Sequence, residues 1–183
     1  MYLLPGIIAF IFFILFDLNK IYFKIEFFNL FFIIGAIFLV FSTSFSIYKS
    51  ISFFGTFTVI KILLVICAVL SLVALIYALF FALPFKTTYS KSDDLPLVCK
   101  GIYAACRHPG FWPFALFYFF LTLLFSGKSL LWCFIIYTAC NFIYIVIQDK
   151  FIFPKYINGY SQYKKIVPFL IPNKNSILKA LKH

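Results

Sequence analysis

Long apolar runs constrain the fold of this chain more than any other feature. Five of them follow one another along the sequence, at residues 3–16, 27–48, 56–85, 111–125 and 130–147. The hydrocarbon core of a bilayer holds no water to satisfy backbone N–H and C=O groups, so such runs cross a membrane as helices. We therefore predict an all-α, polytopic integral membrane protein with about five transmembrane helices.

Composition excludes a soluble domain. Hydrophobic residues make up 64% of the 183 residues, charged residues only 11%, and 29 residues are phenylalanine. A globule of this size cannot bury so much apolar surface, so lipid must solvate it. The net charge of +11 fits a membrane protein that meets anionic headgroups. Membrane lipids are the expected partners, and no nucleic-acid partner is expected because no basic run with interleaved aromatic residues is present.

The first run has a competing interpretation as a signal peptide. It has no basic n-region and no small-residue cleavage site, and the polar residues Asp17, Asn19 and Lys20 close it. We therefore predict that residues 3–16 form a spanning helix that ends at these residues.

The second half of the chain is organised around a hairpin. Only residues 126–129 separate the last two runs, and so short a connection predicts two antiparallel helices. The tail from Gln148 onward mixes aromatic and basic residues, which predicts an amphipathic C-terminal segment on the cytoplasmic membrane surface. We divide the chain into residues 1–85, with three N-terminal transmembrane helices, and residues 86–183, with a cytoplasmic loop, the hairpin and a C-terminal cap.

Basic residues are unevenly distributed between the two sides of five spans. One side carries only Lys49, Lys61 and Lys128. The other side carries thirteen basic residues: Lys20, Lys24, Lys86, Lys91, Lys100, Arg107, Lys150, Lys155, Lys164, Lys165, Lys174, Lys179 and Lys182. The positive-inside rule places this second side in the cytoplasm and the N-terminus outside. Arg107 and Asp149 would then lie at the two cytoplasmic ends of the hairpin, about one helix diameter apart.

The polar stretch 97–109 holds most of the rare chemistry. Arg107 is the only arginine among fifteen lysines, and His108 is the only histidine besides His183. A guanidinium is a planar fork of donors that holds a carboxylate or a backbone carbonyl in fixed geometry, which a lysine cannot do. The alternative is that both residues simply mark a membrane interface, where basic residues commonly end a span.

Enzyme and carrier are the two function classes to compare. Carriers place ionisable residues at mid-membrane and show internal repeats, whereas only Lys61 lies within a span here, near its end. The polar residues gather at the cytoplasmic rim, which favours an enzyme that acts on a lipid-soluble substrate. Five cysteines are present, but only His108 could join them as a convergent ligand, so no metal site is expected. The glycines match neither a dinucleotide nor a P-loop motif.

A first segment of the second half contains Leu97-Val98, Gly101-Ile102-Tyr103, Arg107-His108-Pro109 and Phe111. These residues resemble the L-V-x-x-G-x-Y-x-x-x-R-H-P-x-Y signature of the isoprenylcysteine carboxyl methyltransferase and phospholipid methyltransferase superfamily. The family continues with Glu-Glu-x-x-Leu, then Phe-Gly-x-x-Tyr-x-x-Tyr and a basic stretch that ends in Val-Pro. This chain has Gln148-Asp149, then Tyr156-Ile157-Asn158-Gly159-Tyr160-Ser161-Gln162-Tyr163-Lys164-Lys165-Ile166-Val167-Pro168. The resemblance runs from Leu97 to about Pro172, and it departs from the family at Gln148-Asp149 and at Tyr156-Ile157.

The resemblance implies that residues 86–183 form a methyltransferase-like catalytic region. S-adenosylmethionine would bind in a cytoplasmic pocket under the C-terminal segment, and a lipophilic methyl acceptor (an isoprenylcysteine-like carboxylate, a phospholipid amine or a small thiol) would enter from the bilayer. Carried over residue by residue, Arg107 and His108 are the expected catalytic residues. The expected cofactor-binding residues are Gly101, Tyr103, Arg107, His108, Pro109, Gln148, Asp149, Tyr160 and Tyr163.

The chemistry of S-adenosylmethionine agrees with this residue set. The molecule carries an ammonium, a carboxylate and a sulfonium, so a site needs an acid, a base and aromatic surface. Asp149 supplies the acid, Arg107 and His108 the basic groups, and the tyrosines the aromatic faces. The alternatives are that the tyrosines belong to an aromatic belt and that Asp149 only marks a helix end. An NADPH-dependent reductase of the sterol reductase type and a non-catalytic membrane remnant also remain open.

Overall fold

The computed structural model describes residues 2–51, 58–82 and 101–181, and this part of the chain is all-helical. Among the described residues, four helices are long and apolar enough to cross a membrane: Leu4–Phe23, Glu26–Ser50, Val59–Phe81 and Lys128–Tyr156. A shorter apolar helix, Phe111–Phe125, lies among them. The prediction of an all-α chain is confirmed, and its helices suit a membrane. The predicted boundary at residues 85 and 86 lies outside the described residues.

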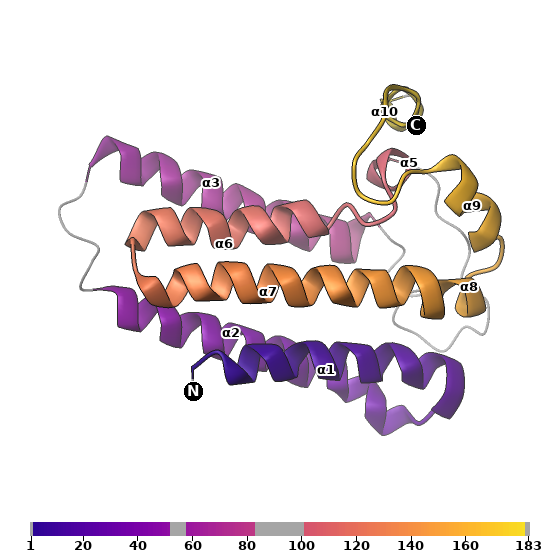
Figure 1. The fold of residues 1–183 in the computed structure, drawn as a ribbon, viewed down its shortest axis with the longest axis horizontal. Helices are drawn as coiled ribbons and strands as arrows, with labels where there is room; N and C mark the ends of the chain where they lie inside the picture. The colour runs from indigo at the N-terminus through magenta and orange to yellow at the C-terminus, as the bar shows by residue number, and fades with distance from the viewer. Residues whose placement is uncertain (1, 52–57, 83–100, 182–183) are drawn as a thin grey trace.

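The first two long helices form an antiparallel pair joined by a tight connection (Figure 1). Their parts are α1 (Leu4–Leu18), the π-helical turn η1 (Asn19–Phe23), the 3-10 turn η2 (Glu26–Asn29) and α2 (Leu30–Ser50). The Asn19 side chain closes the connection, because its amide donates to the carbonyl of Ile25 and its oxygen accepts from the Ile25 N–H, both at 2.9 Å. Lys24 takes the left-handed conformation there, with φ 51°.

The prediction that Asp17, Asn19 and Lys20 close the first helix holds only for α1, which ends at Leu18. Asp17 lies inside α1 with 7% of its surface exposed. Helical backbone continues for six more residues, through η1 to Phe23. A buried carboxylate is tolerated where hydrogen-bond donors surround it, and such donors come from α7, described below.

The remaining long helices complete the bundle (Figure 1). They are α3 (Val59–Ile76) with the π-helical turn η4 (Tyr77–Phe81), α6 (Phe111–Phe125) and α7 (Lys128–Ile147). Ser126 ends α6 in the left-handed conformation, with φ 50°, and Gly127 precedes α7. A Cβ atom at Gly127 would overlap Ser50 of α2, so glycine lets the hairpin turn approach the end of α2.

The C-terminal tail begins as a direct continuation of α7. The π-helical turn η5 (Gln148–Ile152) leads into α8 (Phe153–Tyr156), where Pro154 occupies the first turn, a position at which the missing N–H costs nothing. Gly159 then turns the chain with φ 77°. Three short helices gather with α8 at this end of the bundle (Figure 1), namely α5 (Ile102–Ala105), α9 (Tyr160–Ile166) and α10 (Lys174–Leu181).

The interior combines aromatic packing with a polar seam along α2. Phe10, Phe114, Tyr118, Cys133 and Tyr137 form the largest buried cluster. Two hydroxyls of α2 reach into it, because Ser42 bonds to the Tyr137 hydroxyl and Thr43 bonds to the Tyr118 hydroxyl at 2.7 Å. Much of the outer surface is apolar, as expected of a surface that faces lipid.

Candidate functional site

Backbone pairing joins the loop before α6 to the segment after α9. The Arg107 N–H donates to the carbonyl of Pro168 at 3.0 Å, and the His108 N–H donates to the carbonyl of Phe169 at 3.3 Å. The Trp112 indole donates to the carbonyl of Leu170 at 2.9 Å. The two halves of the sequence signature, about 60 residues apart, therefore lie side by side.

The Arg107 guanidinium donates hydrogen bonds to residues of both the end of the hairpin and the segment that contains α9. Its Nε lies 2.8 Å from Asp149 Oδ1 and its Nη2 lies 3.3 Å from Oδ2. Nη1 donates to the carbonyls of Lys164 at 3.0 Å and Val167 at 2.8 Å. Arg107 and Asp149 were expected about one helix diameter apart, whereas in the structure they are in direct contact.

Asp149 is the centre of this cluster. It is 5% exposed and accepts from the Tyr160 hydroxyl at 2.7 Å. Its Oδ2 also lies 2.9 Å from Lys164 Nζ, so two cationic side chains, Arg107 and Lys164, face one carboxylate. Because these partners already neutralise the carboxylate, Asp149 primarily ties the end of α7 to the loop and to α9.

The three predicted tyrosines extend the same connections. Burial, and then the adjacent Asp149 carboxylate, raises the pKa of the Tyr160 phenol, which remains a donor at neutral pH. The Tyr163 hydroxyl donates to the carbonyl of Tyr103 at 2.6 Å, and the Tyr103 hydroxyl donates to the carbonyl of Ala78 at 3.0 Å. Gly101 precedes α5 with φ 56°, a conformation that favours glycine.

His108 lies beside this cluster, but its Nε2 atom takes no part in the hydrogen bonds among the described residues. Its side chain is 6% exposed and stacks on Phe153 with ring centroids 5.7 Å apart. Nε2 lies 3.6 Å from Asp149 Oδ1, too far for a hydrogen bond, and it has no hydrogen-bond partner among the described residues. Burial lowers the pKa of His108 despite the nearby carboxylate, so the imidazole is neutral at pH 7 and able to accept a proton.

A cavity of about 640 Å³ connects these residues to the interior of the bundle. Seven of the nine predicted site residues line it: Tyr103, Arg107, His108, Pro109, Gln148, Tyr160 and Tyr163. Gly101 and Asp149 are not among its lining residues. Most of the wall is apolar and comes from α1, α2, α3, α6 and α7, so the cavity offers a lipid-like environment with polar groups at one end.

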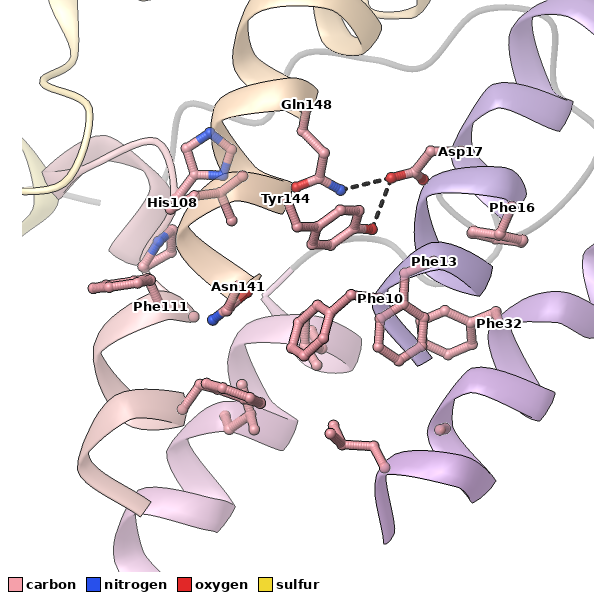
Figure 2. Close-up of a pocket in the computed structure, with 18 of the residues that line it drawn as sticks. Phe10, Phe13, Phe16, Asp17, Phe32, His108, Phe111, Asn141, Tyr144 and Gln148 are labelled. Carbon is pink, nitrogen blue, oxygen red and sulfur yellow. Dashed lines mark hydrogen bonds between the residues drawn. The ribbon is translucent and has the colours of Figure 1, made fainter. Parts of the chain in front are cut away.

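The polar part of the cavity wall that α1 and η1 contribute was not predicted from the sequence. Asp17 and Lys20 line the cavity together with Asn141 and Tyr144 of α7. Asp17 Oδ2 accepts from the Tyr144 hydroxyl at 2.7 Å and from Gln148 Nε2 at 2.8 Å, as Figure 2 shows. The sequence signal was present, since Phe10, Phe13 and Asp17 recur at spacings of three and four and therefore share one helix face.

Family models, curated proteins and solved structures were compared with this chain, and none of them matches it. Fold and site together define a helical protein suited to a membrane, with a largely apolar cavity whose polar end is lined by an acid, a neutral histidine and tyrosines. Within the described residues, no three His, Cys, Asp or Glu side chains gather as a metal site would require.

Proposed function

We propose that this protein is an integral membrane methyltransferase that transfers a methyl group from S-adenosylmethionine to a lipid-soluble or membrane-associated acceptor. One observation carries the proposal: both halves of the signature line a single cavity, with Tyr103, Arg107, His108 and Pro109 on one side and Gln148, Tyr160 and Tyr163 on the other. The cavity continues between the helices, where its apolar wall suits the tail of a lipophilic acceptor.

The residues fit a cationic methyl donor. The cavity presents aromatic faces, the acid Asp17 and the ring of His108, whose Nε2 atom has no hydrogen-bond partner among the described residues. S-adenosylmethionine supplies an electrophilic methyl group on a good leaving group, so the protein mainly aligns the reactants and excludes water. If the acceptor is an amine, His108 can take its proton through Nε2, whereas a carboxylate acceptor needs no base.

The proposed topology has five spans, with the N-terminus outside and the site in the cytoplasm. The span that is added to the four long helices is α6, the fourth in chain order. Its 15 residues extend about 22 Å, less than the roughly 30 Å of hydrocarbon in a typical bilayer. A short span is accommodated by local thinning of the bilayer, and α6 packs beside the longer α7. The basic residues of α9 and α10 support a cytoplasmic location.

Transfer of label tests this proposal directly. Membranes that contain the protein are incubated with S-adenosylmethionine carrying a tritiated methyl group, and the organic extract is counted against membranes without the protein. We expect protein-dependent label in the extract or on membrane proteins, and we expect His108→Ala to lower it. Absence of protein-dependent label, together with oxidation of NADPH by the same membranes, would favour the reductase instead.

A further inference from the structure

Asp17 is a buried acid that faces the cavity from the first helix. Both of its donors, Tyr144 and Gln148, bond to the same oxygen, Oδ2 (Figure 2). No hydrogen bond from the described residues reaches Oδ1. A carboxylate can accept about four hydrogen bonds, so Asp17 is held rigidly in place with acceptor capacity left for a ligand.

Lys20 lies one helical turn beyond Asp17 and lines the same cavity. Its Nζ lies 4.5 Å from the centroid of the Phe16 ring and 5.7 Å from that of Tyr156, so aromatic faces help to position the ammonium. One end of the cavity therefore presents an acid from α1 and a base from η1, three residues apart.

The acid of the signature, Asp149, is paired within the protein. Asp149 is paired with Arg107 at 2.8 Å and with Lys164 at 2.9 Å, and it is not a lining residue of the cavity. A ligand ammonium that sought Asp149 would have to displace a buried ion pair, which is costly. Asp17 offers a carboxyl group that lines the cavity and is held by Tyr144 and Gln148.

We propose that Asp17 and Lys20 form a subsite for a zwitterionic group, with Asp17 receiving an ammonium and Lys20 the anionic group beside it. The proposal rests on the methyltransferase function proposed above. Two ligands of that reaction share this chemistry: the amino-acid end of S-adenosylmethionine and the headgroup of an ethanolamine phospholipid. The subsite assigns a specificity-determining role to the first helix, which lies outside the signature segments.

Calorimetric titration of the detergent-purified full chain tests whether the subsite binds the cofactor or the phospholipid headgroup. The probes are S-adenosylhomocysteine, short-chain phosphatidylethanolamine, and short-chain phosphatidylglycerol, which lacks the ammonium. The variants are Asp17→Asn, which is nearly isosteric, and Lys20→Gln. Glu26→Gln is the matched control, because it removes the same charge from an exposed acid of η2. Thermal unfolding verifies that each variant is folded.

We expect Asp17→Asn and Lys20→Gln each to lower the binding affinity for one of the two zwitterionic probes by about tenfold or more. This is the size of one lost charge-assisted hydrogen bond. Glu26→Gln should change neither, and phosphatidylglycerol binding should not depend on Asp17. Weakened S-adenosylhomocysteine binding assigns the subsite to the cofactor, and weakened phosphatidylethanolamine binding assigns it to the acceptor. If Asp17→Asn does not fold, the same comparison is made with Lys20→Gln alone.

Two results would overturn the subsite. One is unchanged affinity for both zwitterions in folded variants, and the other is a wild-type protein that binds neither of them. A wild type that fails to bind S-adenosylhomocysteine but binds phosphatidylethanolamine through Asp17 would remove the proposed methyltransferase function and leave the subsite intact.

Discussion

Arg107 Nε lies 2.8 Å from Asp149 Oδ1, although 42 residues and a complete helical hairpin separate the two residues in sequence. The same guanidinium bonds to the carbonyls of Lys164 and Val167. A single side chain thus connects the loop before α6, the end of α7 and the segment that contains α9. Positions in both halves of the signature secure the C-terminal segment over the cavity.

Arg107→Lys is expected to loosen this connection. Lysine keeps the charge but cannot reach the carboxylate and both carbonyls at once, so we expect a loss of roughly 2 kcal/mol in the free energy of unfolding. Thermal unfolding in detergent measures the loss, with Lys165→Arg on the exposed side of α9 as a control that should be neutral. Wild-type stability in Arg107→Lys would show that positive charge alone is needed, as at an ordinary membrane interface.

Asp149→Asn should be more damaging than its small change in shape implies. The substitution leaves Arg107 and Lys164 in a buried site without their counter-ion, and breaking such a pair costs about 3 kcal/mol or more. We expect faster proteolysis of the chain after residue 150 together with a lower unfolding temperature. Gln148→Glu, which restores the residue typical of the resembling family, should affect stability less. Equal protease sensitivity of Asp149→Asn and wild type would contradict the structural role of Asp149.

Stability should fall in mild acid because of His108. The pKa of the folded-state imidazole is lowered by burial, while the unfolded chain titrates near its ordinary value of about 6.5. As the pH falls below that value, the unfolded state takes up a proton first, so stability declines by up to about 1.4 kcal/mol per pH unit until the folded-state pKa is reached. Asp149, Arg107 and Lys164 face the ring.

Unfolding temperatures of wild type and His108→Gln at pH 7.5 and 5.5 measure this effect. The wild type should lose more stability than His108→Gln over this interval. His183→Gln, which removes the only other histidine, should behave as the wild type does. An identical pH dependence in wild type and His108→Gln would show that the imidazole is not buried in its neutral form.

Close packing of α1 against α7 gives a prediction that is independent of function. A Cβ atom at Gly6 would overlap the Tyr137 ring, whereas one at Gly110 would have only ordinary contacts, the nearest at 3.7 Å from Ala78. Gly6→Ala should therefore destabilise the protein by about 1–3 kcal/mol, and Gly110→Ala should be close to neutral. Chemical unfolding of both variants provides the comparison.

Much of the fold could be predicted because it depends on local hydrophobicity. The run at residues 111–125 coincides with α6, and the other runs contain the cores of α1, α2, α3 and α7. The boundaries were less predictable, since polarity placed the end of the first helix at Asp17, Asn19 and Lys20, whereas helical backbone continues through η1 to Phe23. A carboxylate inside a bundle is stabilised by tertiary donors, here Tyr144 and Gln148, which lie far away in sequence.

The site could be predicted only in outline. The resemblance named residues that line one cavity, but it could not distinguish those that face the cavity from those that support them. Asp149 supports the wall through Arg107 and Lys164, whereas Asp17 faces the cavity. This difference follows from side-chain direction in η5 and at the end of α1, which the order of residues does not reveal.

Ligand-dependent stability is the most direct test of the proposed function. The detergent-purified protein is unfolded thermally with no ligand, with S-adenosylhomocysteine and with NADPH, each in large excess. A ligand that binds only the folded state at a hundred times its dissociation constant stabilises it by about 2.7 kcal/mol, so the unfolding temperature should rise by several degrees with S-adenosylhomocysteine and remain unchanged with NADPH. A rise with NADPH alone, or with neither ligand, would contradict the assignment as a methyltransferase.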